Sequence, residues 1–106
     1  METRLPRPDP NGDDPPHHWA PSVTADGTVY LARGGSGCGD STKIVRFRTG
    51  DSPEGTVVLT LPADRFDTAS TYARSNPNGS MTVFFDRVSC TSGRSDIYKL
   101  RDPPAP

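Results

Sequence analysis

The sequence has few apolar residues and no long apolar run. Hydrophobic residues make up 31% of the 106 positions, and aromatic residues make up 8%. No apolar stretch approaches the roughly 20 residues that a membrane-spanning helix needs. Met1–Ala20 also lacks the apolar centre of a secretory signal. We therefore expect no membrane insertion and identify no signal peptide in this chain.

The sequence also lacks an excess of positive or negative residues. Twelve lysines and arginines stand against 13 aspartates and glutamates, which gives a net charge of -1. The basic residues are scattered along the chain, whereas nucleic-acid binding requires a basic patch or stripe. We therefore expect no nucleic-acid partner.

Histidine is scarce, and this bears on catalysis and metal binding. His17 and His18 are the two histidines, and both precede Ser41, which follows glycine and aspartate as some hydrolase nucleophiles do. A triad would require one of them to fold back beside a carboxylate. The glycine-rich stretch before Ser41 has Asp40 where a phosphate-binding loop has lysine. Two histidines are too few ligands for a metal. We predict no catalytic residue, no metal site and no cofactor.

Turn-forming residues, in contrast, are abundant. The 10 glycines and 12 prolines separate short runs of strand-forming residues, which indicates an all-β fold with a thin core. We predict a Pro/Asp-rich disordered leader over 1–19, a β-repeat domain over 20–101 and a disordered tail over 102–106. The predicted strands lie near 22–25, 28–33, 42–48, 56–61, 69–73, 81–87 and 95–101.

One pattern occurs twice in the β-repeat domain. Each copy has a turn dipeptide, an apolar run, a polar loop with one cysteine and a second strand-like run. The turns Asp26-Gly27 and Asn78-Gly79 are offset by 52 positions, and Ile44 and Ile97 by 53. Both dipeptides are typical of hairpin turns. A period near 50 indicates a repeat array such as a propeller, with blade-like repeats at about 21–61 and 69–101.

The second copy carries a resemblance to a known family. Asn76-Pro77-Asn78-Gly79-Ser80, the apolar strand ending at Asp86-Arg87, and Asp96-Ile97-Tyr98 resemble the blade motif of TolB-type β-propellers. The first copy matches less well, because Thr24-Ala25-Asp26-Gly27 lacks the proline. Lys43-Ile44-Val45-Arg46 stands where Asp-Ile-Tyr is usual. The resemblance covers about 80 residues.

The resemblance implies antiparallel four-stranded blades around a channel. Fewer than two blades are present, so the expected fold is a partial β-propeller. Three arrangements stay open: a segment of a longer propeller, a ring completed by self-association, and a compact two-sheet fold that shares the motif. We rank the propeller segment first.

The two cysteines, Cys38 and Cys90, occupy equivalent loops of the two repeats. Equivalent loops of neighbouring blades lie on the same rim, so we predict a disulfide, with free thiols as the alternative. Closing a loop of about 50 residues stabilises a fold by about 3 to 4 kcal/mol in the chain-entropy model. A disulfide implies an oxidising compartment, and we expect a periplasmic or extracellular location.

Charged residues at predicted strand ends are the candidates for a binding rim. These are Arg33, Asp86 and Arg87. The alternative is that their charges only satisfy neighbouring groups in the loops. The resemblance implies a non-enzymatic binding or scaffold module with a protein partner or self-association. A carbohydrate-binding module and a non-catalytic propeller piece of a peptidase-like enzyme are the alternatives. An apolar sheet edge would favour a protein partner, and an exposed aromatic pair beside polar residues would favour a sugar.

Overall fold

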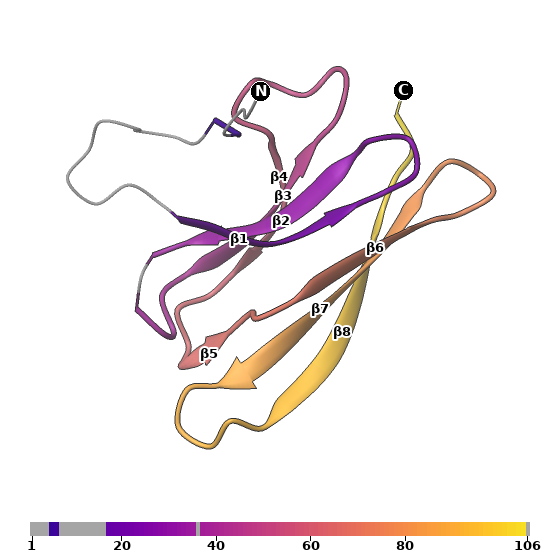
Figure 1. The fold of residues 1–106 in the computed structure, drawn as a ribbon. Coiled ribbons are helices and arrows are strands. Elements are labelled where there is room, and N and C mark those ends of the chain that lie inside the picture. Colours follow the sequence, from indigo (N-terminus) through magenta and orange to yellow (C-terminus); the bar gives the residue numbers. More distant parts are fainter. Residues whose placement is uncertain (1–4, 7–16, 36, 106) are drawn as a thin grey trace.

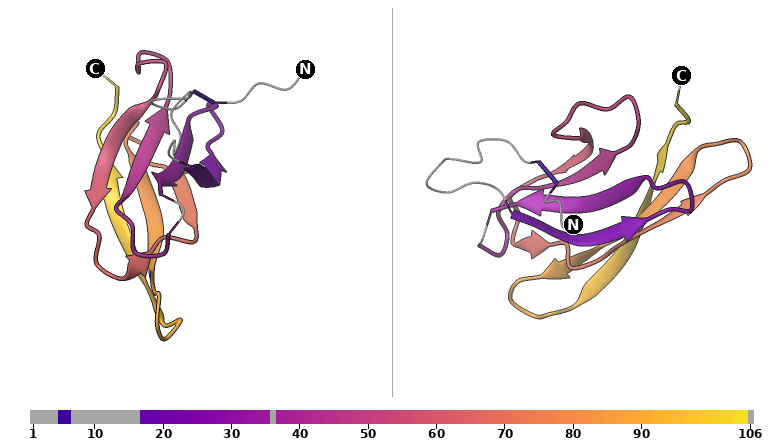
Figure 2. Two further views of the ribbon diagram at one scale, coloured as in Figure 1. Left: turned by 90° about the vertical axis from the view of Figure 1, so that its left-hand side faces the viewer. Right: turned by 45° about the horizontal axis from the view of Figure 1, so that its top comes forward.

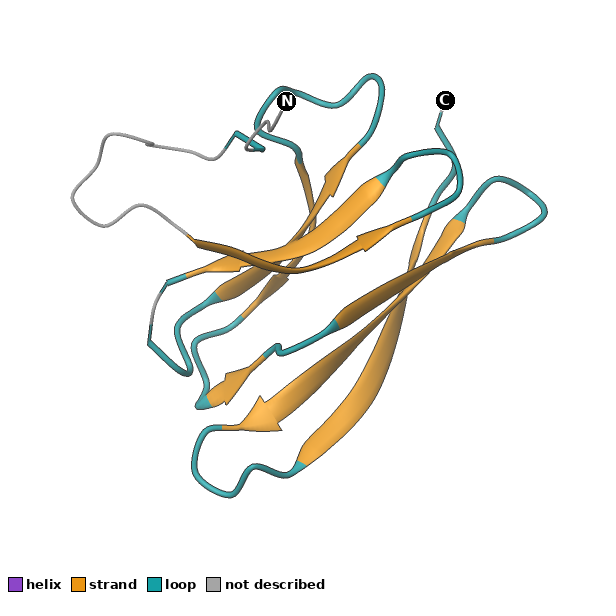
Figure 3. Cartoon of the chain, in the orientation of Figure 1, coloured by secondary structure: helices purple, strands orange, loops and turns teal. Residues whose placement is uncertain are grey.

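The computed structural model describes residues 5–6, 17–35 and 37–105, and most of the predicted disordered leader lies outside them. The described part is all-β and contains no helix (Figure 3). Its strands are β1 (His17–Val23), β2 (Val29–Gly34), β3 (Thr42–Phe47), β4 (Thr56–Leu61), β5 (Phe66–Asp67), β6 (Thr71–Ser75), β7 (Met81–Ser89) and β8 (Ser95–Asp102).

Two antiparallel sheets contain these strands (Figure 1). The first sheet follows chain order, β1-β2-β3-β4. In the second, β7 lies at the centre and pairs with β8 on one side. On the other side β7 pairs with β6 near its start and with β5 near its end, where Phe66 is opposite Ser89. The segment 68–70 separates β5 from β6, so the two form one interrupted edge.

The internal repeat corresponds to two similar three-stranded meanders, β1-β2-β3 and β6-β7-β8. β2 and β7 begin 52 positions apart, at Val29 and Met81, and β3 and β8 begin 53 apart. The turns also match. Gly27 and Gly79 have φ angles of 88° and 87°, in the left-handed region where glycine carries no Cβ penalty.

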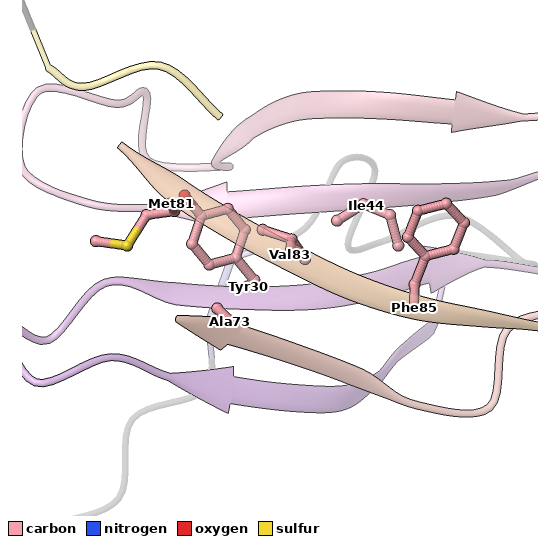
Figure 4. Close-up of a cluster of buried hydrophobic side chains, with 6 residues drawn as sticks. All are labelled: Tyr30, Ile44, Ala73, Met81, Val83 and Phe85. Carbon is pink, nitrogen blue, oxygen red and sulfur yellow. The ribbon is translucent and has the colours of Figure 1, made fainter. Parts of the chain in front are cut away.

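The core lies between the two sheets, which pack face to face. Tyr30 and Ile44 project from the first sheet, and Ala73, Met81, Val83 and Phe85 project from the second (Figure 4). Because side chains alternate along a strand, Thr82, Phe84 and Asp86 of β7 point to the outer face of the second sheet. Full burial of each large apolar side chain stabilises the fold by about 1.5–3 kcal/mol.

One flank of this two-sheet structure is closed by β1 against β6. The backbone N–H of Ala73 donates to Ser22 Oγ at 2.9 Å, and the Thr71 hydroxyl donates to the carbonyl of Ala20. Trp19 Nε1 donates to the carbonyl of Thr68 at 2.6 Å. β4 and β8 lie on the opposite flank (Figure 2). That flank therefore has two sheet edges that face solvent.

The structure corrects both ends of the predicted β-repeat domain. β1 begins at His17, inside the segment predicted as leader, because it pairs with β2 from His17 opposite Gly34 and because Trp19 donates to the Thr68 carbonyl between β5 and β6. β8 extends through Asp102, which was assigned to the tail, because this carboxylate is the buried partner of Arg46. The all-β antiparallel class is confirmed. Neither sheet closes on itself over the described residues, and membership of a propeller stays a prediction.

Candidate binding surface

β8 is a long edge strand with one free side. It pairs with β7 over all eight of its residues, and no described strand pairs with its other edge. Ile97 and Tyr98 are 67% and 50% exposed, although both are large and apolar in character. Such an edge offers unpaired backbone donors and acceptors to an extended segment. We define this edge and the adjoining pocket as the β8 flank.

Backbone direction along β8 follows from the hairpin that precedes it. The Ser89 N–H donates to the Arg94 carbonyl at 2.8 Å, and pairing continues from Val88 opposite Ser95 without a register shift. Along an antiparallel ladder, residue pairs that exchange backbone hydrogen bonds alternate with residue pairs that do not. The backbone groups of Ile97, Lys99 and Arg101 therefore point to the free edge.

A pocket of about 310 Å³ opens beside the inward side of β8. Ligand pockets typically begin near this size and combine apolar walls with a few polar groups. The first sheet contributes the end of β4, and the second sheet contributes β5, β7 and β8. The lining residues are Leu61, Pro62, Asp64, Phe66, Phe85, Arg87, Asp96 and Tyr98.

Arg87 is the buried cation of this pocket. Its Nη2 lies 2.5 Å from Asp64 Oδ1, and its guanidinium carbon lies 5.9 Å from the centre of the Phe66 ring. Asp96 is its cross-strand neighbour on β8. Nη1 is buried and has no hydrogen-bond partner among the described residues. The side chains of Phe85 and Tyr98 stack beside it with ring centres 5.9 Å apart.

A second buried cation, Arg46, lies between the sheets. Its Nη1 donates to both carboxylate oxygens of Asp102 at 2.9 Å, and its Nη2 donates to Asp51 at 2.6 Å. Tyr30 also donates to Asp102. Hydrogen bonds from Arg46 hold the pKa of Asp51 below its usual value. Burial raises the pKa of Tyr30, and the bond to Asp102 adds to this rise.

The Arg46 cluster was missed by sequence reasoning. Its members are far apart in the chain, and Arg46 was read as part of an ordinary strand. One signal was present in the sequence: a charged residue between apolar ones in a strand pattern implies a buried charge, which requires a partner. Both carboxylates of this cluster accept from Arg46, and Asp51 also accepts from the Thr56 hydroxyl. We therefore assign the cluster to stabilisation of the fold and not to ligand binding.

The predicted rim residues occupy three separate environments. Arg33, 5% exposed, donates to His18 Nε2 and to the Glu54 carbonyl on the outer face of the first sheet. Asp86 accepts hydrogen bonds from the N–H groups of Ala69 and Ser70. Arg87 points to the inner face and the pocket. The structure thus does not combine them in one rim, and of the three, Arg87 contributes to the β8 flank.

The two cysteines lie at disulfide distance. The sulfurs of Cys38 and Cys90 are 2.06 Å apart, and their Cα atoms are 6.0 Å apart. The bond joins the β2–β3 loop to the β7–β8 loop, so it connects the two sheets at equivalent positions of the repeat. This agrees with the prediction from spacing and fits an oxidising compartment.

The described residues also show whether a metal site or a membrane-spanning helix is present. No three His, Cys, Asp or Glu side chains converge there in a group able to hold a metal ion. Within the same ranges, no helix has the length and apolar character required to cross a membrane. Comparisons with protein-family models, curated proteins and solved structures found no match to this chain.

Proposed function

We propose that this protein is a non-enzymatic binding module that pairs the free edge of β8 with an extended segment of a protein partner. The observation that carries the proposal is the exposed eight-residue edge strand, which has Ile97 and Tyr98 at its surface. Addition of a strand to a sheet edge provides affinity through main-chain hydrogen bonds and specificity through pockets for alternate side chains.

The surroundings of β8 support this proposal. The opposite flank is occupied by the contact of β1 with β6, whereas the pocket lies directly beside the inward side of β8. The resemblance to TolB-type propellers also implies protein–protein interaction. The disulfide supports a location outside the reducing cytosol, and we propose a periplasmic or extracellular one.

Backbone pairing is tested by Lys99→Pro. Proline removes the N–H that points to the free edge, and edge strands tolerate proline at such positions. The probe is a fluorescent heptapeptide of alternating threonine and valine, which has no charged side chains. Fluorescence anisotropy should show at least a tenfold loss of affinity for Lys99→Pro. The matched variant Lys99→Ala, which keeps the N–H, should bind like the wild type.

Three results would oppose the proposal: no measurable binding by the wild-type protein, equal affinity of the wild type and Lys99→Pro, or equal loss in both variants. Circular dichroism of each variant establishes that the sheets are retained. A folded Lys99→Pro variant that still binds would mean that the peptide uses a surface other than the free edge of β8.

A sugar ligand is the second candidate, because one observation favours it specifically. Tyr98 is half-exposed and stacks on Phe85, and the carboxylates of Asp96 and Asp64 line the same pocket. Aromatic faces beside carboxylates suit the apolar and hydroxyl groups of a sugar ring. Titration with simple neutral oligosaccharides, followed through intrinsic fluorescence, tests it. A saturable change that Tyr98→Ala abolishes would support this candidate, and an unchanged signal would oppose it.

A further inference from the structure

The two rows of side chains on β8 differ in chemistry. Leu100 packs against the core, and Asp96 and Tyr98 line the pocket, so this row points inward. Lys99 and Arg101 alternate with it and point to the outer face of the second sheet. A strand added beside β8 would also alternate, so its side chains would face two different environments.

The outer environment is basic. Lys99 lies in a cross-strand row with Phe84 and Tyr72, and Arg101 lies in the next row with Thr82 and Arg74. Arg74, Lys99 and Arg101 are exposed. The salt bridges of the described residues involve none of these three cations.

Asp86, the carboxylate of β7 on this face, is not free to neutralise them. Asp86 accepts hydrogen bonds from the Ala69 and Ser70 backbone and from the Ser70 hydroxyl, and it is 8% exposed. Like charges side by side on an edge repel a second copy of the same strand, which protects the sheet from self-association. The same arrangement favours an incoming strand with carboxylates at matching positions.

The inner environment is largely apolar. Leu61, Phe66 and Phe85 form pocket walls, and Arg87 with Asp64 and Asp96 forms its polar part. The two carboxylates outnumber the guanidinium, so an acidic side chain would be disfavoured there. An apolar side chain of the added strand suits these walls.

We propose that the segment bound by β8 has acidic residues alternating with apolar ones. Its carboxylates lie on the outer face opposite Lys99 and Arg101, and an apolar side chain enters the pocket. This inference rests on the proposed pairing of β8 with an extended segment, and it adds the chemistry of that segment.

Three fluorescent octapeptides test the inference: alternating Glu and Val, alternating Lys and Val, and alternating Glu and Ser. At about 0.1 M salt, we expect the Glu/Val peptide to bind at least tenfold more tightly than the Lys/Val peptide. It should also bind at least tenfold more tightly than the Glu/Ser peptide, which keeps the charges and loses the apolar side chains. Raised salt should reduce the first difference.

The double variant Lys99→Glu/Arg101→Glu should reverse the order of the Glu/Val and Lys/Val peptides. Lys43→Glu introduces a negative charge at an exposed position on the first sheet, away from the β8 flank, and should preserve the order. Equal affinities for Glu/Val and Lys/Val, together with sensitivity to Lys99→Pro, would overturn the acidic pattern and leave strand pairing in place. Tight binding of the Glu/Ser peptide would overturn the apolar contact. Peptide affinities that Lys99→Pro leaves unchanged would overturn the pairing itself.

Discussion

Arg46 and Asp102 form the most heavily paired buried charges described in this protein. Both oxygens of Asp102 accept from Arg46, and Tyr30 donates to the same carboxylate. Removing one partner of a buried ion pair leaves the other charge uncompensated. We therefore predict that Asp102→Ala lowers the free energy of unfolding by about 3–5 kcal/mol. Denaturant unfolding measures this, with the exposed Asp96→Asn as control. Equal stability of Asp102→Ala and the wild type would contradict the role of the pair.

The Asp51 carboxylate predicts a dependence of stability on pH. Its folded-state pKa is lowered, chiefly by hydrogen bonds from Arg46. The resulting stabilisation is present above the unfolded pKa of about 3.9 and is lost as the pH falls through the folded pKa. Asp51→Asn should therefore be less stable than the wild type at pH 7 by about 1.5–3 kcal/mol.

This difference between Asp51→Asn and the wild type should shrink as the pH falls below 4 and through the lowered folded-state pKa of Asp51, because the folded wild type then also takes up a proton at this carboxylate. Unfolding curves at a series of pH values test this, and Glu54→Gln provides an exposed control with little expected effect. A difference that stays constant down to low pH would show that Asp51 acts through its shape rather than its charge.

At the scale of elements, Asp86 explains why the edge formed by β5 and β6 is interrupted. Its carboxylate replaces a strand partner for the N–H groups of Ala69 and Ser70. Asp86→Ala should leave both groups without this acceptor, cost about 1–3 kcal/mol and speed hydrogen exchange at the two amides. Asp86→Asn, which retains one carbonyl oxygen, should show a smaller effect. Unchanged exchange at both amides in Asp86→Ala would contradict this.

Most strands were predictable because their turns are encoded locally. The dipeptides Asp26-Gly27 and Asn78-Gly79 fix the hairpins before β2 and β7, and an apolar run follows each turn. The start of β1 is not evident from the sequence, because His17 and His18 are polar, Pro21 interrupts the strand, and contacts with β6 hold it. β5 has two residues, too few for any periodic pattern to reveal.

The candidate site was less predictable than the strands. The position of Arg87 at a strand end identifies it as a candidate, but its neighbours Asp64 and Phe66 come from the segment between the strands predicted near 56–61 and 69–73. Their proximity depends on how the sheets pack, which local patterns do not specify. Strand ends do not share one rim here: Arg33 lies on the first sheet, and alternation along β7 of the second sheet places Asp86 and Arg87 on opposite faces.

For the whole molecule, the disulfide supplies stability that the thin core lacks. It links Cys38 and Cys90 across 52 positions, and a loop of that length contributes about 3 to 4 kcal/mol in the chain-entropy model. The double variant Cys38→Ala/Cys90→Ala should lose about this free energy of unfolding. The wild type in reductant should lose a similar amount. Full stability of the double variant would contradict a structural role for the bond.

The face-to-face packing of the sheets leaves the β8 flank open while β1 and β6 close the other. This asymmetry is the basis of the proposed binding function, because a strand added at β8 gains main-chain bonds and a pocket together. The repeat revealed the two meanders, but their relative orientation comes from core packing and from the disulfide.

The most direct test of strand pairing at β8 is residue-resolved hydrogen exchange with and without the Glu/Val octapeptide. The amides of Ile97, Lys99 and Arg101 point to the free edge and should exchange quickly in the free protein. We predict that the peptide slows these three amides, whereas those of Tyr98 and Leu100 are already slow through pairing with β7. Unchanged exchange along β8 with bound peptide, or new protection confined to the outer face of the first sheet, would contradict the account.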